Sequence, residues 1–211
     1  PLVSTVVMTV TLAKVAGVRE IVVCTPCGAD KAVNPVLLYA LRSAGATEVY
    51  RVGGIQSVGM MAFGTETVRP VLKIVGPGNA YVTAAKRQVY GFVGIDQVAG
   101  PSEIAVLADD SADPAWVAAD MLSQAEHGSG YEKALLVTDS RGLAEAVRAE
   151  IARQTPSLSR ADMIGRVVGN SGILLAVVPD VGQGIELVNR FAPEHLEIMA
   201  RGARALMKQV R

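Results

Sequence analysis

The chain is poor in aromatic, cysteine and histidine residues, and each shortage narrows what it can be. Only 4% of its 211 residues are aromatic although half are hydrophobic, so Val, Ala, Leu and Ile must form the core. That composition is typical of α/β proteins with buried parallel strands. The only cysteines, Cys24 and Cys27, form one Cys-Thr-Pro-Cys with no second pair to complete a metal site. We therefore favour reduced thiols in a cytoplasmic protein over a redox or zinc role for this pair.

Neither sign of charge predominates, because 20 basic residues balance 20 acidic ones. The absence of a basic stripe or an acidic tail argues against nucleic-acid and membrane-surface partners and favours a small-molecule substrate. No apolar run reaches the length of a membrane span, and the start lacks a signal-peptide pattern. The chain opens at Pro1 without a methionine, which suggests a piece of a longer protein.

Hydrophobic runs and turn residues predict strands that alternate with helices. We expect strands over residues 20–24, 48–52, 71–75, 103–108, 133–138, 173–178 and 195–199. Helices are expected over residues 4–16, 34–43, 53–62, 80–90, 113–127, 140–154, 157–168, 180–191 and 203–210. Alternation with short Gly-rich junctions predicts parallel β-α-β units with right-handed crossovers. The predicted fold is therefore α/β, with two Rossmann-like lobes over residues 1–98 and 99–211 and mostly parallel sheets.

Two Gly-rich junctions follow predicted strands. Gly76-Pro-Gly-Asn79 opens a helix, so its free N–H groups are suited to an anion or a nucleotide phosphate. Gln56 follows Gly53-Gly54 at another helix start, where its amide can bind a ligand. Ligands of open α/β sheets bind at the carboxyl ends of strands, which favours both loops as sites. The alternative is that these glycines only permit tight turns.

Both histidines of the chain follow a glutamate, as Glu126-His127 and Glu194-His195. Gln124 and His127 are three residues apart, so a helix would place both on one face. An amide oxygen and an imidazole can bind a borderline cation, but two ligands are too few for a tight zinc site. The alternative is a helix cap or a surface histidine. By default, we expect Glu126 to be a solvated charge and Trp116 to fill the core.

Nine motifs in a fixed order resemble the histidinol dehydrogenase family over essentially the whole chain. They are Lys14-Val-Ala-Gly-Val18, Val52-Gly-Gly-Ile-Gln56, Phe63-Gly-Thr-Glu-Thr67, Gly76-Pro-Gly-Asn-Ala-Tyr81, Ala85-Lys-Arg87, Gly94-Ile-Asp96, Ala99-Gly-Pro-Ser-Glu103, Leu122-Ser-Gln-Ala-Glu-His127 and Ala192-Pro-Glu-His-Leu196. The resemblance implies oxidation of L-histidinol, through the aldehyde, to L-histidine with two NAD⁺ and a zinc ion that stays redox-inert.

The resemblance also implies roles for individual residues. Gln124 and His127 match zinc ligands that also contact the substrate, and Ser102 matches a further substrate contact. Gln56 and Asn79 match NAD-binding positions. The pair Glu194 and His195 matches the catalytic residues: His195 would take the alcohol proton and contact the substrate, and Glu194 would activate the water that attacks the aldehyde.

Parts of the family pattern lie outside this sequence. An aspartate and a further histidine that bind zinc, and a substrate-binding glutamate, come later in family members, and a cofactor-contacting tyrosine comes earlier. Family members are intertwined homodimers in which the second subunit supplies some contacts. We therefore expect this chain alone to bind zinc weakly and to be inactive. Two alternatives stay open: a related enzyme for another alcohol such as sulfopropanediol, and a shortened, non-catalytic paralogue.

Overall fold

The computed structural model describes residues 2–211. The chain divides into two compact units, residues 1–99 and residues 100–211. Every paired strand in the described residues runs parallel to its neighbour, which gives the predicted α/β fold. None of the helices between residues 2 and 211 is long and apolar enough to cross a membrane.

The second unit is built on one four-stranded sheet of order β7-β6-β5-β8. Its strands are β5 (Glu103–Ala108), β6 (Lys133–Thr138), β7 (Ile173–Val177) and β8 (His195–Met199). Its helices are α6 (Pro114–Ala125), α7 (Arg141–Gln154), α8 (Ala161–Gly169), α9 (Val181–Phe191) and α10 (Ala203–Met207), with a 3-10 turn η2 (Thr155–Ser157). The first strand β5 is central, because the chain winds to one side through β6 and β7 and then returns to the other side for β8.

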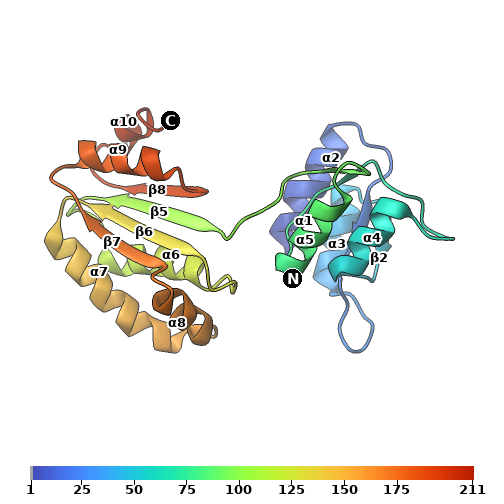
Figure 1. The fold of residues 1–211 in the computed structure, drawn as a ribbon, viewed down its shortest axis with the longest axis horizontal. Helices are drawn as coiled ribbons and strands as arrows, with labels where there is room; N and C mark the ends of the chain where they lie inside the picture. The colour runs from blue at the N-terminus through green and yellow to red at the C-terminus, as the bar shows by residue number, and fades with distance from the viewer. Residues whose placement is uncertain (1) are drawn as a thin grey trace. The chain divides into compact units, whose positions relative to one another are not determined.

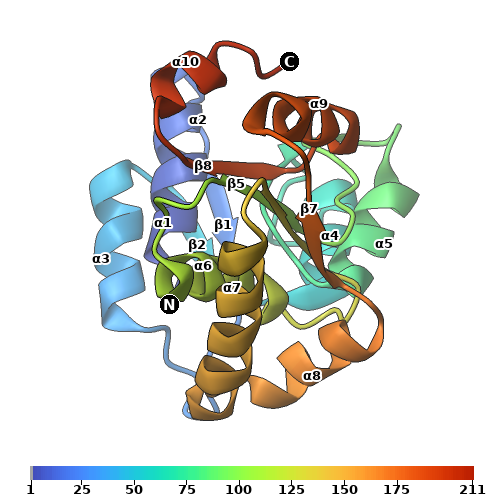
Figure 2. The same cartoon turned by 90° about the vertical axis from the view of Figure 1, so that its left-hand side faces the viewer.

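Helices cover both faces of this sheet, with α7 and α9 on opposite sides of it (Figures 1 and 2). Successive side chains of β5 point to opposite faces of the sheet, so this strand contributes to the hydrophobic cores on both faces. Val106 packs with α6 and α7, while Leu107 packs with α9. Both side chains are fully buried, as expected for a central strand that has helices on both faces.

The first unit has shorter strands in two separate pairs, β1 with β2 and β3 with β4. Its strands are β1 (Val22–Cys24), β2 (Glu48–Tyr50), β3 (Lys73–Ile74) and β4 (Gly94–Ile95), the last of which was not expected from the sequence. Its helices are α1 (Val3–Val6), η1 (Val7–Thr11), α2 (Leu12–Val15), α3 (Pro35–Ala44), α4 (Gly54–Phe63) and α5 (Ala80–Val89). The middle segment η1 of the expected helix over residues 4–16 is a π-helix.

Helix ends follow local chemistry closely. The carboxylate of Asp113 accepts the Ala115 N–H at 2.8 Å and so caps α6, whose first residue is Pro114. Ser140 and Asp180 cap α7 and α9 in the same way. Strands β1 to β3 and the last helix α10 are shorter than expected, whereas β5, β6 and β8 match their predicted bounds.

The expectation that Trp116 fills the core is wrong, because its side chain is 69% exposed. Helix α6 buries the neighbouring Val117 and Ala118 and, one turn later, Met121 and Leu122. Trp116 precedes this stripe and projects away from it.

Candidate active site and cofactor-binding residues

The candidate residues of the second unit gather at the amino-terminal edge of its sheet. Ser102 directly precedes β5, His127 lies between α6 and β6, and His195 is the first residue of β8. Pairing of His195 with Ile104, and a bond from the Lys133 N–H to the Ser102 carbonyl (3.2 Å), keep these segments level. This edge is opposite to the carboxyl ends at which ligands of open α/β sheets usually bind.

Gln124 carries a buried amide group without a protein partner. The residue is 4% exposed, and its Nε2 is the buried side-chain nitrogen or oxygen that has no hydrogen bond among the described residues. Leaving such a group unsatisfied costs about 1–3 kcal/mol, so buried polar groups without partners call for an explanation. The two ends of a glutamine amide can exchange by a simple flip, which would offer the oxygen to a cation.

His127 lies two residues beyond the end of α6 rather than inside the helix as expected. Its ring turns back on the helix, and Nδ1 lies 3.1 Å from the Ser123 carbonyl oxygen and 3.0 Å from that of Gln124. Carbonyls only accept, so Nδ1 is the donor to them, and in the neutral form of the ring this leaves the lone pair on Nε2. Donation of the second ring N–H to a carbonyl is the usual orientation of a metal-binding histidine.

His195 lies on the face of β8 that carries α6. Side chains alternate along a strand, and both Met199 and Glu197 face α6, so His195 shares their side. Helix α6 runs antiparallel to the strands, and Asp120 is level with Glu197. One helical turn from Asp120 to Gln124 advances roughly 6 Å, and two residues from Glu197 to His195 advance about 7 Å. His195 and Gln124 therefore lie at similar heights above the edge.

The Glu194–His195 pair is open to solvent. The His195 Nε2 and Glu194 Oε1 atoms are 3.7 Å apart, which is beyond hydrogen-bond distance, and both side chains are at least half exposed. The preceding Ala192 has a φ of 51°, in the left-handed region, and ends α9. This strained residue sets the direction in which the chain leaves α9 toward Glu194 and His195.

The carboxyl groups of Asp120 and Glu197 are neighbours about one turn of α6 away from this edge. Burial, together with a hydrogen bond and charge repulsion from Asp120, raises the pKa of Glu197 to about 7. One proton shared between the two carboxyls explains the hydrogen bond. The sequence singled out neither residue, because they become neighbours only through the packing of α6 on β8.

Glu132 is a third residue that the sequence did not single out. It is 2% exposed and accepts the N–H groups of Ser129 (2.6 Å) and Gly130 (2.8 Å) in the loop after His127. Burial acts to raise the pKa of Glu132, but the surrounding N–H donors outweigh it and the pKa is lowered. Asn170 donates to the Gly130 carbonyl at 2.8 Å, so the loop is held from two sides.

In the first unit, Gln56 and Asn79 both follow strands at carboxyl ends, as expected. Gln56 is exposed in the first turn of α4, after β2. Asn79 caps α5, because its Oδ1 accepts the Val82 N–H at 3.1 Å. A side chain on Gly78 would lie 2.4 Å from Val82 Cγ1, so glycine is required for the loop to pass this close to α5.

An ion pair between a buried lysine and a partly exposed aspartate supports that loop. Lys86 is 5% exposed and binds the Asp96 carboxylate and the Gly76 carbonyl. Burial acts to raise the pKa of Asp96, but hydrogen bonds from Lys86 and from the N–H groups of Gly76 and Gln97 lower it overall. The pair therefore ties α5 to the start of the Gly-rich loop.

Within residues 2–211, no group of three or more His, Cys, Asp or Glu side chains is arranged to hold a metal ion. Gln124 and His127 are thus two candidate donors at one edge, and Cys24 and Cys27 are free thiols elsewhere in the chain. Two donors fit a cation that takes its remaining ligands from outside this chain.

Known proteins match the chain along its whole length. The family model for histidinol dehydrogenase matches residues 1–211. Histidinol dehydrogenases of Rhizobium meliloti (strain 1021) and Agrobacterium fabrum (strain C58) are 48% and 50% identical over 208 residues, which is 99% of this chain. The crystal structure of histidinol dehydrogenase from Elizabethkingia anophelis matches with a TM-score of 0.92 and 38% identity, covering all of this chain and 48% of that one. The chain spans about half the length of the curated relatives it matches, and it belongs to the histidinol dehydrogenase family.

Proposed function

We propose that this chain carries part of the active site for zinc- and NAD-dependent oxidation of L-histidinol, through the aldehyde, to L-histidine. Support comes first from the family, whose named members act on histidinol. The observation that carries the proposal is the buried amide of Gln124 without a partner, one turn from a histidine whose Nδ1 faces two carbonyls.

Zinc fits this edge as far as the chain reaches. His127 would bind it through Nε2, and Gln124 through its amide oxygen, which a flip of the amide would bring to the buried position that has no partner. When bound, zinc would hold the amine and imidazole of the substrate and would not change redox state. The other ligands would come from the rest of a longer polypeptide or from the second subunit of a homodimer. Ser102, level with the first residue of β8, would contact the substrate.

His195 and Glu194 would divide the proton transfers. His195 would accept the proton of the alcohol in the first oxidation. NAD⁺, when bound, would accept one hydride in each of the two oxidations. Glu194 would take a proton from the water that adds to the aldehyde, and the resulting hydrate would give the acid on loss of its hydride to the second NAD⁺. The exposure of both side chains leaves room for the substrate between them and the edge of the sheet.

Gln56 and Asn79 would bind NAD. Both lie at helix starts that follow strands, where first-turn N–H groups favour the phosphates of a dinucleotide. The Asn79 side chain already caps α5. It would therefore contribute to NAD binding by holding the first turn of α5 in place.

Calorimetric titration of this chain with zinc tests the metal proposal. We expect weak binding of one ion that disappears in His127→Ala and survives in Glu126→Gln, which changes the neighbouring charge and no proposed ligand. Tight zinc binding with normal turnover of histidinol by this chain alone would contradict the proposal that half of the ligands lie elsewhere. Equal binding by the chain and by His127→Ala would exclude His127 as a ligand.

The catalytic roles are tested in a protein of the relatives' length that contains this region. His195→Asn should suppress hydride transfer to NAD⁺ and leave zinc affinity nearly intact. Glu194→Gln should slow the aldehyde-to-acid half more than the first oxidation, as followed by supplying the aldehyde directly. If Glu194→Gln slows both halves equally, the role in water activation is wrong.

A further inference from the structure

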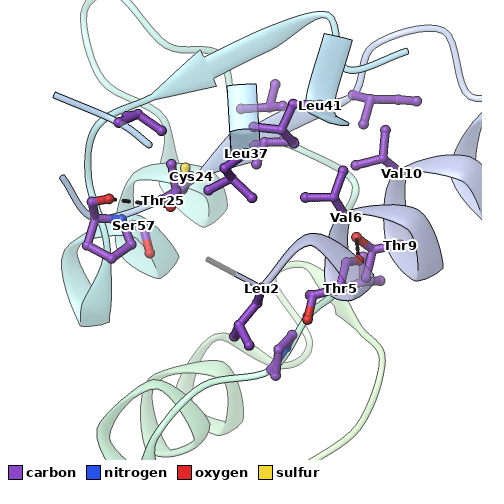
Figure 3. Close-up of a pocket in the computed structure, with 18 of the residues that line it drawn as sticks. Leu2, Thr5, Val6, Thr9, Val10, Cys24, Thr25, Leu37, Leu41 and Ser57 are labelled. Atoms are coloured by element: carbon purple, nitrogen blue, oxygen red, sulfur yellow. Dashed lines mark hydrogen bonds between the residues drawn. The ribbon is translucent and has the colours of Figure 1, made fainter. Parts of the chain in front are cut away.

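A long apolar groove divides the first unit. Its volume is about 810 Å³, and Figure 3 shows Val6 and Val10 on one side and Leu37 and Leu41 on another, with Cys24 at the end of β1. Residues 21–25, which contain β1, and residues 74–77, which start with the last residue of β3, both line it. The groove therefore runs between the two strand pairs of this unit.

Each strand that lines the groove has one edge without a partner. Strand β1 pairs only with β2, and β3 only with β4, in the described part of the chain. In a parallel strand, alternate residues bond to opposite sides. Ile21 and Thr25 bond to β2, so Val22 and Cys24 turn their N–H groups toward the groove.

The same alternation holds for β3. The carbonyls of Leu72 and Ile74 accept from Gly94 and Asp96 on the β4 side, so Lys73 and Val75 present their backbone groups at the other edge of β3, where Val75 lines the groove. Two rows of free main-chain donors and acceptors thus line an apolar slot. This combination fits a β-strand better than a compact ligand, because only a strand satisfies both rows along their length.

The second unit shows what is absent from the first. Its first strand, β5, lies between β6 and β8 and joins the cores on both faces of the sheet. The first unit has the same winding, with α1 packed on α3 and α4 packed on α5. Its two cores, however, share no residue: one contains Val6 and Leu41, and the other contains Val58 and Ile74.

We propose that the groove holds one further parallel strand, joined directly to the amino end of α1, which completes a sheet of order β2-β1-strand-β3-β4. A right-handed crossover from that strand through α1 to β1 places α1 where it lies, beside α3. The strand would be apolar on both faces and about five residues long. The matched relatives have the length to supply it, since this chain spans 47% of one of them. This inference does not depend on the zinc and NAD proposals.

The second unit provides a probe strand. Residues 103–113 comprise β5 and the loop that ends at Asp113, the cap of α6. A copy of these residues is placed directly ahead of Pro1. A matched control carries the same extension with its copies of Val106 and Leu107 replaced by aspartate, which abolishes the apolar character of both faces.

Two measurements report whether a strand occupies the groove. Hydrogen exchange should slow about tenfold or more at the Val22, Cys24, Lys73 and Val75 amides in the extended chain and not in the aspartate control. Alkylation by iodoacetamide should slow at Cys24, which lines the groove, relative to the exposed Cys27 in the same molecule. Slow exchange at Leu107 and Leu136, fully buried in the second unit, shows that each protein is folded.

Unchanged protection in the extended chain, or equal protection in the aspartate control, would overturn the proposal. The unextended chain is also measured with 5 mM NAD⁺, a concentration of the order used for weak sites. If NAD⁺ protects the four amides and the strand does not, the groove is a dinucleotide pocket and the strand assignment is wrong.

Discussion

Replacing Glu197 with glutamine should remove a pH dependence of stability that comes from the shared proton of the Asp120–Glu197 pair. Burial and Asp120 raise the pKa of Glu197 from an ordinary value of 4.5 to about 7 in the folded protein. Between these two values the folded state binds more protons than the unfolded state. The free energy of unfolding therefore decreases as pH rises from 4.5 to 7, and the contribution is fully present only at lower pH.

The magnitude is limited by solvent. At 1.36 kcal/mol per unit of pKa, the difference between 4.5 and about 7 corresponds to at most about 3.4 kcal/mol. Glu197 is only partly buried, so solvent screening reduces this ceiling to about 1 kcal/mol. In Glu197→Gln the amide can still donate to the Asp120 carboxylate but has no proton to lose. The variant should match the wild type near pH 5 and be more stable by about 1 kcal/mol at pH 8.

Urea unfolding from pH 5 to pH 8 measures this difference. The single tryptophan, Trp116, lies on α6 with Asp120, so its fluorescence follows the second unit. Glu186→Gln, on the exposed surface of α9, is the matched control and should run parallel to the wild type. Subtraction of wild type from variant cancels the histidines, which both proteins share. Parallel curves for Glu197→Gln and wild type would refute the shared proton.

Three further changes test other contacts. Glu132→Gln replaces one carboxylate oxygen by an NH2 group, which faces the N–H of Ser129 or Gly130 and cannot accept from it. The free energy of unfolding should fall by about 2 kcal/mol, measured by urea unfolding followed by Trp116 fluorescence. Lys86→Met removes the ammonium partner of the partly exposed Asp96 carboxylate, which keeps the N–H groups of Gly76 and Gln97, and should cost the first unit about 1 kcal/mol in circular-dichroism melts; an unchanged melting temperature would contradict the role of the pair. Ala192→Gly relieves the left-handed backbone and should stabilise the second unit by about 1 kcal/mol, whereas a lowered melting temperature would show that the turn is not strained.

The fold was largely predictable because local signals agree with tertiary structure. Strands such as β5 and β6 are continuous apolar runs, and proline and a capping residue mark where α3 and α6 begin. The short β4 was not predictable, because two residues carry no periodicity and pair only through the fold. Trp116 was misassigned because residue type alone does not define which side of a helix is buried.

The candidate site was predictable only in its residue types. The sequence places Gln124 and His127 three residues apart, but the bonds from the His127 ring to two carbonyls depend on where α6 ends. Asp120 and Glu197 are 77 positions apart in the sequence, and only the packing of a helix on an edge strand brings them together. The location of the site at the amino-terminal edge follows from the same geometry.

That location has an electrostatic consequence. Peptide dipoles add along a helix to about half a positive charge at its start and about half a negative charge at its end. The candidate residues of the second unit surround the end of α6, where carbonyls favour a cation or a protonated amine. Those of the first unit lie at the starts of α4 and α5, where N–H groups favour an anion. The candidate residues of the two units thus lie at opposite ends of their helices, which carry opposite partial charges.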